Sequence, residues 1–235
     1  MPRNETPMSV KPFASVVCWM LLILSAAHAQ KAMNLDQHLL IKISDKTLYG
    51  DPAAEKVVGT PYLNDNFVIG VVYSHAVKYT GVSMRYNIYD DNIEFKQNNK
   101  LFILDPQQKI NRVELDGRIY VIDSYEYKGK IRLGFFGLLD SGRVVLLSRN
   151  VVTYKEQQAP KALESGPTPA KYTRAPDTYF YRIGDGVLMK VDNIKKMIDG
   201  FPDKQTELTE FVKKEKISAR KEADLLKLVK YYNSL

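Results

Sequence analysis

The chain contains almost no cysteine, histidine or tryptophan: its 235 residues include one Cys, three His and one Trp. A single cysteine, Cys18, excludes an intrachain disulfide, and so few Cys and His residues leave little material for a zinc cluster. With only 13 Gly and 11 Pro, the chain is neither collagen-like nor a proline-rich disordered protein. What remains is the composition of a folded domain, with 45% hydrophobic residues, 26% charged residues and a net charge of +7. Composition therefore excludes several classes of protein but indicates no activity.

The N-terminus carries the most specific motif. Basic residues precede an apolar run from Phe13 to Ala27, which ends in the sequence Ala27-His28-Ala29. A run of about 15 residues is shorter than the roughly 20 that a membrane-spanning helix needs. A small-residue A-x-A site followed by polar residues is typical of a cleaved secretory signal. We therefore expect residues 1–29 to be a signal peptide cut between Ala29 and Gln30, with an uncleaved membrane anchor as the alternative.

Cleavage at this site would leave a mature chain without cysteine. Cys18 lies inside the apolar run and follows Val17, where a lipoprotein signal would have a small residue, so we do not expect lipidation. No later segment is long and apolar enough to span a membrane as a helix. The sequence therefore predicts an exported protein that is periplasmic, envelope-associated or secreted, with no transmembrane segment after cleavage.

The middle of the chain has the pattern of an antiparallel β meander. Within Val82–Tyr89, the apolar residues Val82, Met84, Tyr86 and Ile88 alternate with more polar ones, which is the two-residue period of a strand. Turn sequences such as Asp116-Gly117 and Lys128-Gly129 recur about every ten residues. We assign residues 30–58 to an irregular entry segment and residues 59–155 to this β domain. Periodicity leaves open a curled sheet, an open barrel or a sandwich.

The last third of the chain contains two segments that differ from the β domain in composition and pattern. Residues 156–177 contain four prolines and few bulky apolar residues, which predicts a linker or a strap over the surface. Residues 178–235 then predict a β hairpin around Gly184-Asp185-Gly186, followed by three short helices. Asp192-Asn193 is positioned to cap the first helix and Ser218 the third. The expected fold class is α+β.

Four stretches of the sequence are distinctive together: TPYLNDNF near Thr60, MRYNIYDDNIEF near Met84, GDGVLMKV at Gly184, and the ending LLKLVKYYNSL. On these strings the chain resembles a family of exported bacterial cell-envelope proteins whose function is unassigned. The resemblance covers most of the chain from about Gly50 onward. It implies an envelope location, and it implies no activity and no catalytic or binding residues.

Metal, cofactor and nucleophile chemistry are poorly supported. After cleavage only His38 and His75 remain, and neither has a partner at a metal-ligand spacing. The acids near Asp90 lack the spacing of an EF-hand loop, and there is no G-x-S-x-G motif. Gly184-Asp185-Gly186 lies between two strands, where a phosphate-binding loop would precede a helix. We expect no metal and no cofactor.

A hydrolase that uses two carboxylates remains possible, because such an enzyme needs two acids facing one cleft. The candidate acids on strands and turns are Glu94, Asp105, Glu114, Asp123 and Asp140. Glu114 and Asp123 lie on strands that flank the Asp116-Gly117 turn. Acids in such positions usually face solvent, so we favour a non-enzymatic protein.

Binding is suggested by the 15 tyrosines, all after residue 29. The pairs Tyr125/Tyr127 and Tyr179/Tyr181 each fall on one strand face, although strands also use tyrosine for packing alone. The C-terminal helices mix ten basic with eight acidic side chains from Asp192 onward, so we expect no nucleic-acid binding. The sequence favours a binding module for an unknown protein, envelope polymer or lipid. A carrier of an apolar or lipid ligand in a curled sheet and a carboxylate hydrolase are the alternatives.

Overall fold

The computed structural model describes residues 30–32, 35, 39–42, 57–75, 77–98, 100–160 and 166–235. Ala27 and Ala29, on one side of the expected cleavage site, lie outside these residues, as does most of the predicted entry segment. Gln30, on the other side, is the first residue of strand β1 (Gln30–Ala32), which pairs in parallel with β4.

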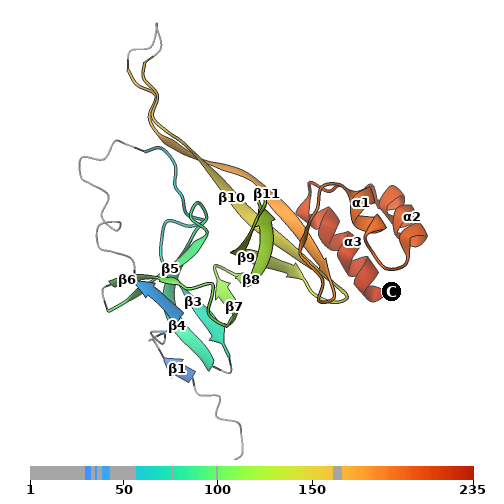
Figure 1. Cartoon of the computed structure of the whole chain (residues 1–235), viewed down its shortest axis with the longest axis horizontal. Coiled ribbons are helices and arrows are strands. Elements are labelled where there is room, and N and C mark those ends of the chain that lie inside the picture. Colours follow the sequence, from blue (N-terminus) through green and yellow to red (C-terminus); the bar gives the residue numbers. More distant parts are fainter. Residues whose placement is uncertain are drawn as a thin grey trace, which may run out of the picture.

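The described part of the chain forms one twelve-stranded sheet followed by three helices (Figure 1). In spatial order the main path is β12-β11-β10-β9-β8-β7-β3-β4-β5-β6-β2. The strands are β2 (Leu40–Lys42), β3 (Val68–Ser74), β4 (Val77–Asn87), β5 (Asn92–Gln97), β6 (Lys100–Leu104), β7 (Ile110–Leu115), β8 (Arg118–Tyr127), β9 (Lys130–Asp140), β10 (Val144–Lys155), β11 (Lys171–Ile183) and β12 (Met189–Lys190). Except for β1 with β4, neighbouring strands run antiparallel. The expected α+β fold with an antiparallel meander is confirmed, and the sheet is curled.

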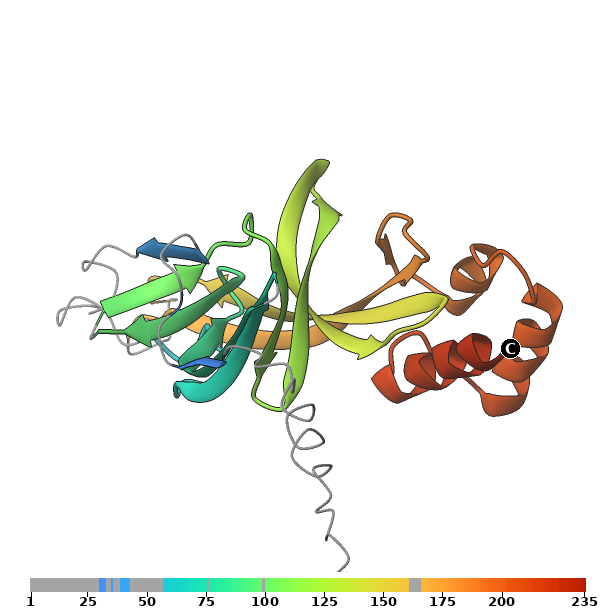
Figure 2. The same cartoon turned by 90° about the horizontal axis from the view of Figure 1, so that it is seen from below.

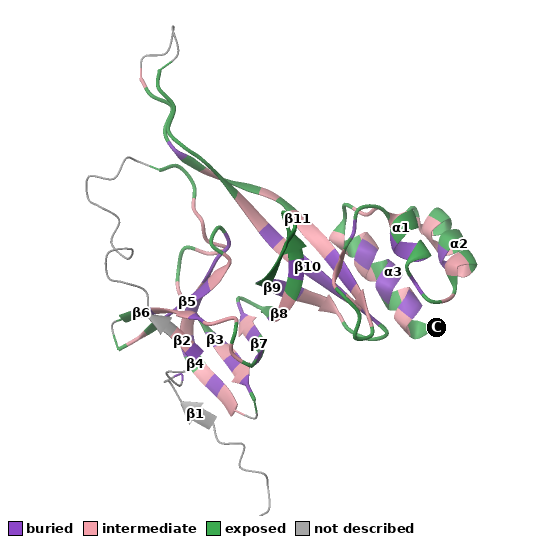
Figure 3. Cartoon of the chain, in the orientation of Figure 1, coloured by how far each residue is buried: buried purple, intermediate pink, exposed green. Residues whose placement is uncertain are grey.

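The curl encloses the larger apolar core. Val82, Met84 and Tyr86 of β4, and Ile88 just after it, are all at most 5% exposed, so the predicted alternation along this strand is confirmed. Aromatic side chains from other strands fill the space above them, and Tyr86 packs edge-on against Tyr120 with ring centroids 5.3 Å apart. The inside of the curl is therefore occupied by packed side chains. Figure 3 marks the buried positions of these strands in purple.

Tight turns set the register of the hairpins. Asp116 and Gly117 have φ angles of 52° and 71°, and Lys128 and Gly129 have 52° and 74°. Two positive φ angles in a two-residue loop are the signature of a type I′ turn, whose twist matches that of the flanking strands. These turns join β7 to β8 and β8 to β9, as the sequence predicted.

Two predicted segments need correction. Residues 171–177, assigned to the Pro-rich linker, belong to β11, which pairs with β10 through cross-strand pairs such as Tyr154 with Tyr172. Pro176 is tolerated because it lies where the register shifts, between the pairs of Arg149 and Val151. The entry segment is not wholly irregular either, since β1 and β2 fall within it.

Three helices cover the end of the sheet where β10 starts: α1 (Ile194–Asp199), α2 (Gln205–Glu215) and α3 (Glu222–Ser234). Asn193 caps α1 as expected, accepting a hydrogen bond from the Lys196 amide. Ser218 does not cap α3, which begins after Lys221; its hydroxyl instead accepts from the Arg220 amide. Among the described residues, no helix combines the length and apolar character that crossing a membrane requires.

The helices and the sheet share a second apolar core. Leu225, Leu228 and Val229 of α3 are fully buried in it with Val144 and Leu146 of β10. Polar contacts at its edge add to this packing. The carboxylate of Asp203 accepts hydrogen bonds from Arg143 and from the Tyr232 hydroxyl, both at 2.8 Å. The helical unit is therefore attached to the sheet rather than suspended from a linker.

The attachment predicts a large effect of one core substitution. Leu228→Ala removes a side chain with no exposed surface and leaves a cavity, so we expect it to lower the free energy of unfolding by about 2–5 kcal/mol. Leu235→Ala, at a residue that is 43% exposed, is the control and should change it by less than about 1 kcal/mol. Urea denaturation followed by circular dichroism measures both. Equal effects would contradict the docking of α3.

Candidate functional site: a cleft where the sheet opens

The sheet opens between β9 and β10. The two strands pair only through Gly137, Leu138 and Asp140 of β9, next to the β9–β10 turn. Beyond Gly137, β9 continues towards Lys130 paired with β8 alone, while β10 continues paired with β11. Figure 2 shows the yellow-green β8–β9 hairpin standing away from the long β10–β11 pair. The opening leaves one edge of β9 facing β10 across a gap.

A cleft of about 810 Å³ occupies this opening. Its lining comes from the β4–β5 turn, the β8–β9 hairpin, β10, β11 and the segment around β12, and it mixes aromatic, charged and aliphatic side chains. These residues are Ile88, Tyr89, Asp90, Asp91, Asn92, Pro106, Tyr125, Glu126, Tyr127, Arg132, Leu133, Arg149, Asn150, Val151, Val152, Thr178, Phe180, Leu188, Lys190 and Asp192. A site of this size and mixed character suits a ligand that has both polar and apolar parts.

Asp91 lies at the closed end of the cleft and ties its walls together. Its Oδ1 accepts hydrogen bonds from the Tyr86 hydroxyl at 2.6 Å and from the backbone N–H of Phe135 at 3.4 Å. Its Oδ2 accepts one from Arg149 at 2.8 Å, in an ion pair whose side chains are only 14% and 19% exposed. One carboxylate thus joins the β4–β5 turn to both β9 and β10. Burial, with a further contribution from Asp91, raises the pKa of Tyr86 well above its ordinary value, so the phenol stays a donor.

Glycine makes room for this contact. A Cβ on Gly134 would lie 2.6 Å from Asp91 Oδ2 and 2.8 Å from the Tyr125 ring. A Cβ on Gly137 would lie 2.8 Å from the Ser148 hydroxyl, where β9 and β10 still pair. Isolated glycines within strands often mark such close approaches.

Tyr125 and Phe180 line the floor of the cleft and belong to a small aromatic cluster with the buried Phe136. Phe136 and Phe180 pack edge-on with ring centroids 5.2 Å apart, and Tyr125 packs against both. The Arg149 guanidinium carbon lies 4.2 Å from the centre of the Tyr125 ring. Stacking on an aromatic ring and pairing with a carboxylate both restrict an arginine side chain. The charged group at the base of the cleft is therefore held in place before any ligand arrives.

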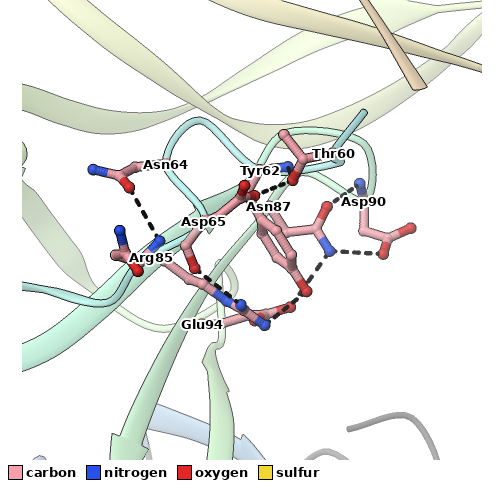
Figure 4. A network of polar contacts seen from close by, with 9 residues as sticks. Thr60, Tyr62, Asn64, Asp65, Arg85, Asn87, Asp90 and Glu94 are labelled. Carbon is pink, nitrogen blue, oxygen red and sulfur yellow. Dashed lines mark hydrogen bonds and ion pairs between the residues drawn. The ribbon is translucent and has the colours of Figure 1, made fainter. Parts of the chain in front are cut away.

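A second polar network lies next to the cleft and has a structural role (Figure 4). Arg85 of β4 pairs with Glu94 of β5 at 2.7 Å and donates to the Tyr62 hydroxyl. Its guanidinium carbon lies 3.7 Å from the Tyr62 ring centre and 4.5 Å from that of Phe67. The network holds the segment before β3 against the outer face of the sheet.

The carboxylates considered for a hydrolase are not brought together. Each of the strand acids has its own cation: Glu94 pairs with Arg85, Glu114 with Arg112, and Asp123 with Arg182. Glu114 is opposite Ile119 on β8, and Asp123 lies four residues further on, or about 13 Å along the strand. Glu94 is three strands away from Glu114, about 14 Å across the sheet. Catalytic carboxylate pairs are roughly 5–10 Å apart.

The other predicted candidates take structural positions. Asp105 accepts hydrogen bonds from Gln107 and Gln108 in a turn, and Asp140 accepts one from Asn233 of α3. His38 lies outside the described residues, and His75 lies beside the Ser74 hydroxyl at the end of β3. Where the structure describes the chain, no group of three or more His, Cys, Asp or Glu side chains is placed to hold a metal ion.

Sequence reasoning missed the two residues at the base of the cleft. Asp91 has the sequence context of an ordinary turn acid, and Arg149 that of a polar residue in a strand. Tyr125 and Tyr127 were expected to share a strand face, and their ring centroids are 6.4 Å apart at the cleft. The missed signal was the pair of glycines, Gly134 and Gly137, inside an otherwise apolar strand.

Gly134→Ala should disturb the site specifically. The added methyl would meet Asp91 and Tyr125, so we expect Asp91 to shift and the free energy of unfolding to fall by about 1–3 kcal/mol. Gly166→Ala is the matched control, since no atom of the described residues lies within 4 Å of its added Cβ. Thermal unfolding compares the two variants, and a tolerated Gly134→Ala would contradict the contact.

Comparison with known proteins gives no relative from which to assign the site: no protein-family model, curated protein or solved structure matches this chain. The resemblance to exported envelope proteins therefore stays a prediction.

Proposed function

We propose that this protein is an exported, non-enzymatic binding module and that the cleft between β9 and β10 is its binding site. The observation that carries the proposal is the fixed base of the cleft. Asp91 is hydrogen-bonded to Tyr86, Phe135 and Arg149, and its partner Arg149 lies over the Tyr125 ring. Such restraint is what a binding site needs if little entropy is to be lost when a ligand arrives.

The lining supports binding more than catalysis. The charged group most deeply placed in the cleft, Asp91, already has three hydrogen-bond donors. A carboxylate whose two oxygens already accept three hydrogen bonds has few lone pairs left to attack or deprotonate a substrate. Around it, Tyr89, Tyr127 and Leu133 are more than 40% exposed and provide contact area at the rim.

The two alternative functions have less support. A carrier would need room on the inside of the curl, where the described side chains pack against one another. A hydrolase would need paired acids, and the strand carboxylates lie apart, each beside a cation. Export rests on the N-terminal motif and remains part of the proposal.

The test is native mass spectrometry of the protein purified from its own cell envelope under conditions that keep non-covalent ligands. We expect a discrete added mass on the unmodified protein. Val151→Trp, which places a large ring in the cleft, should abolish the added mass. Val187→Trp is the control, since Val187 is 78% exposed and does not line the cleft.

Retention of the mass by Val151→Trp would contradict the assignment of the cleft, and so would its absence from all three proteins. The measured mass also reports whether the chain begins at Gln30.

A further inference from the structure

Resting on the proposed binding function, we propose that the cleft takes an extended segment of a partner protein, which adds as a strand to the free edge of β9. Strand addition uses main-chain hydrogen bonds for affinity and alternate side chains for specificity. It requires an edge with unpaired N–H and C=O groups, and the geometry of the β8–β9 hairpin determines which groups these are.

The type I′ turn fixes the hydrogen-bonding pattern of β9. In a two-residue hairpin the residues that flank the turn, here Tyr127 and Lys130, form a hydrogen-bonded pair. Pairs then alternate along an antiparallel ladder, so Arg132 and Gly134 direct their backbone groups towards β8. Ile131, Leu133 and Phe135 direct theirs away from β8, towards the cleft.

An independent contact confirms this direction. The N–H of Phe135 donates to Asp91, on the side of β9 away from β8. By the same alternation, the N–H and C=O groups of Ile131 and Leu133 point the same way. Within the described ranges, no strand pairs with β9 at these two residues on that side. The backbone N–H and C=O groups of these two residues are therefore unpaired beside the cleft.

The two unpaired residues on this edge have apolar, exposed side chains. Ile131 is 73% exposed and Leu133 is 44% exposed. By contrast, the outer edge of β11 is interrupted by Pro176 and partly covered by β12. Proline and covering strands prevent unwanted strand pairing, and an open apolar edge invites it.

The walls are suited to side chains that alternate between two faces. An added strand would project residues on one face towards the aromatic floor formed by Tyr125 and Phe180, and on the other towards the β4–β5 turn. Residues 126–132, at the tip of the hairpin, carry three exposed cations, Lys128, Lys130 and Arg132, and one exposed acid, Glu126. Charge complementarity therefore favours a segment with acidic residues at the end nearest the tip.

Peptides selected from a random dodecapeptide library on the full protein provide the probe, and isothermal titration calorimetry measures their binding. Leu133→Pro removes an outward N–H without removing a bond to β8, so we expect affinity for the selected peptide to fall about tenfold. Leu133→Ala is the matched control, because it keeps the N–H, and it should change affinity less than threefold. Lys130→Glu should weaken binding of acidic peptides, with the effect reduced by salt.

The outcomes separate the two proposals. Ile131→Pro repeats the test at the next outward residue, in case Leu133→Pro unfolds, which circular dichroism would show. If both proline variants bind normally while Val151→Trp does not, the cleft binds its ligand without strand addition, and this inference fails alone. If no library peptide binds, or if Val151→Trp also leaves the affinity of the selected peptide unchanged, an extended polypeptide is not the ligand of the cleft. A glycan or lipid mass from the native protein would also overturn it.

Discussion

The carboxylate of Asp91 is the contact on which the form of the sheet depends. Three donors from separate elements converge on it: the Tyr86 hydroxyl, the Phe135 amide and the Arg149 guanidinium. Asp91 lies where β9 and β10 cease to pair. Its carboxylate accepts the hydrogen bond of the Phe135 amide, which a carbonyl of β10 would accept if the two strands stayed paired. A side chain in a low-dielectric position thus takes the place of a ladder hydrogen bond. Without it, the open edge would begin with an unpaired buried donor.

The opening of the sheet follows from its two separate cores. One core lies inside the curl and includes Tyr86, Tyr120 and Phe135, and the other binds the three helices to the start of β10. The β8–β9 hairpin packs against the first core, while β10 and β11 extend away from the second core. The strands diverge between them, and Tyr125 and Phe180 of the aromatic cluster line the floor of the cleft. The cleft is a consequence of how the two halves are joined.

The sequence predicted what local patterns control. The alternating face of β4, the turns with positive φ and the Asn193 cap depend on residues within a few positions of one another, and all three predictions are confirmed. The first part of β11, residues 171–177, was missed, because Pro176 suggests a linker unless the bulge opposite it is known. The cleft was missed for a different reason. Divergence of β9 from β10 depends on contacts over 40 residues or more, such as Asp91 with Phe135 and Arg149, and no periodicity in one sequence encodes them.

Amide hydrogen exchange along β9, measured residue by residue by NMR, tests the open edge most directly. The structure predicts slow exchange at Arg132 and Gly134, whose amides bond to β8, and fast exchange at Ile131 and Leu133, whose amides face the cleft. Phe135 should be protected by Asp91. Uniformly slow exchange from Ile131 to Phe135 would mean that β9 and β10 pair along their length. The cleft would then not exist in the free protein, and the account given for its function would be wrong.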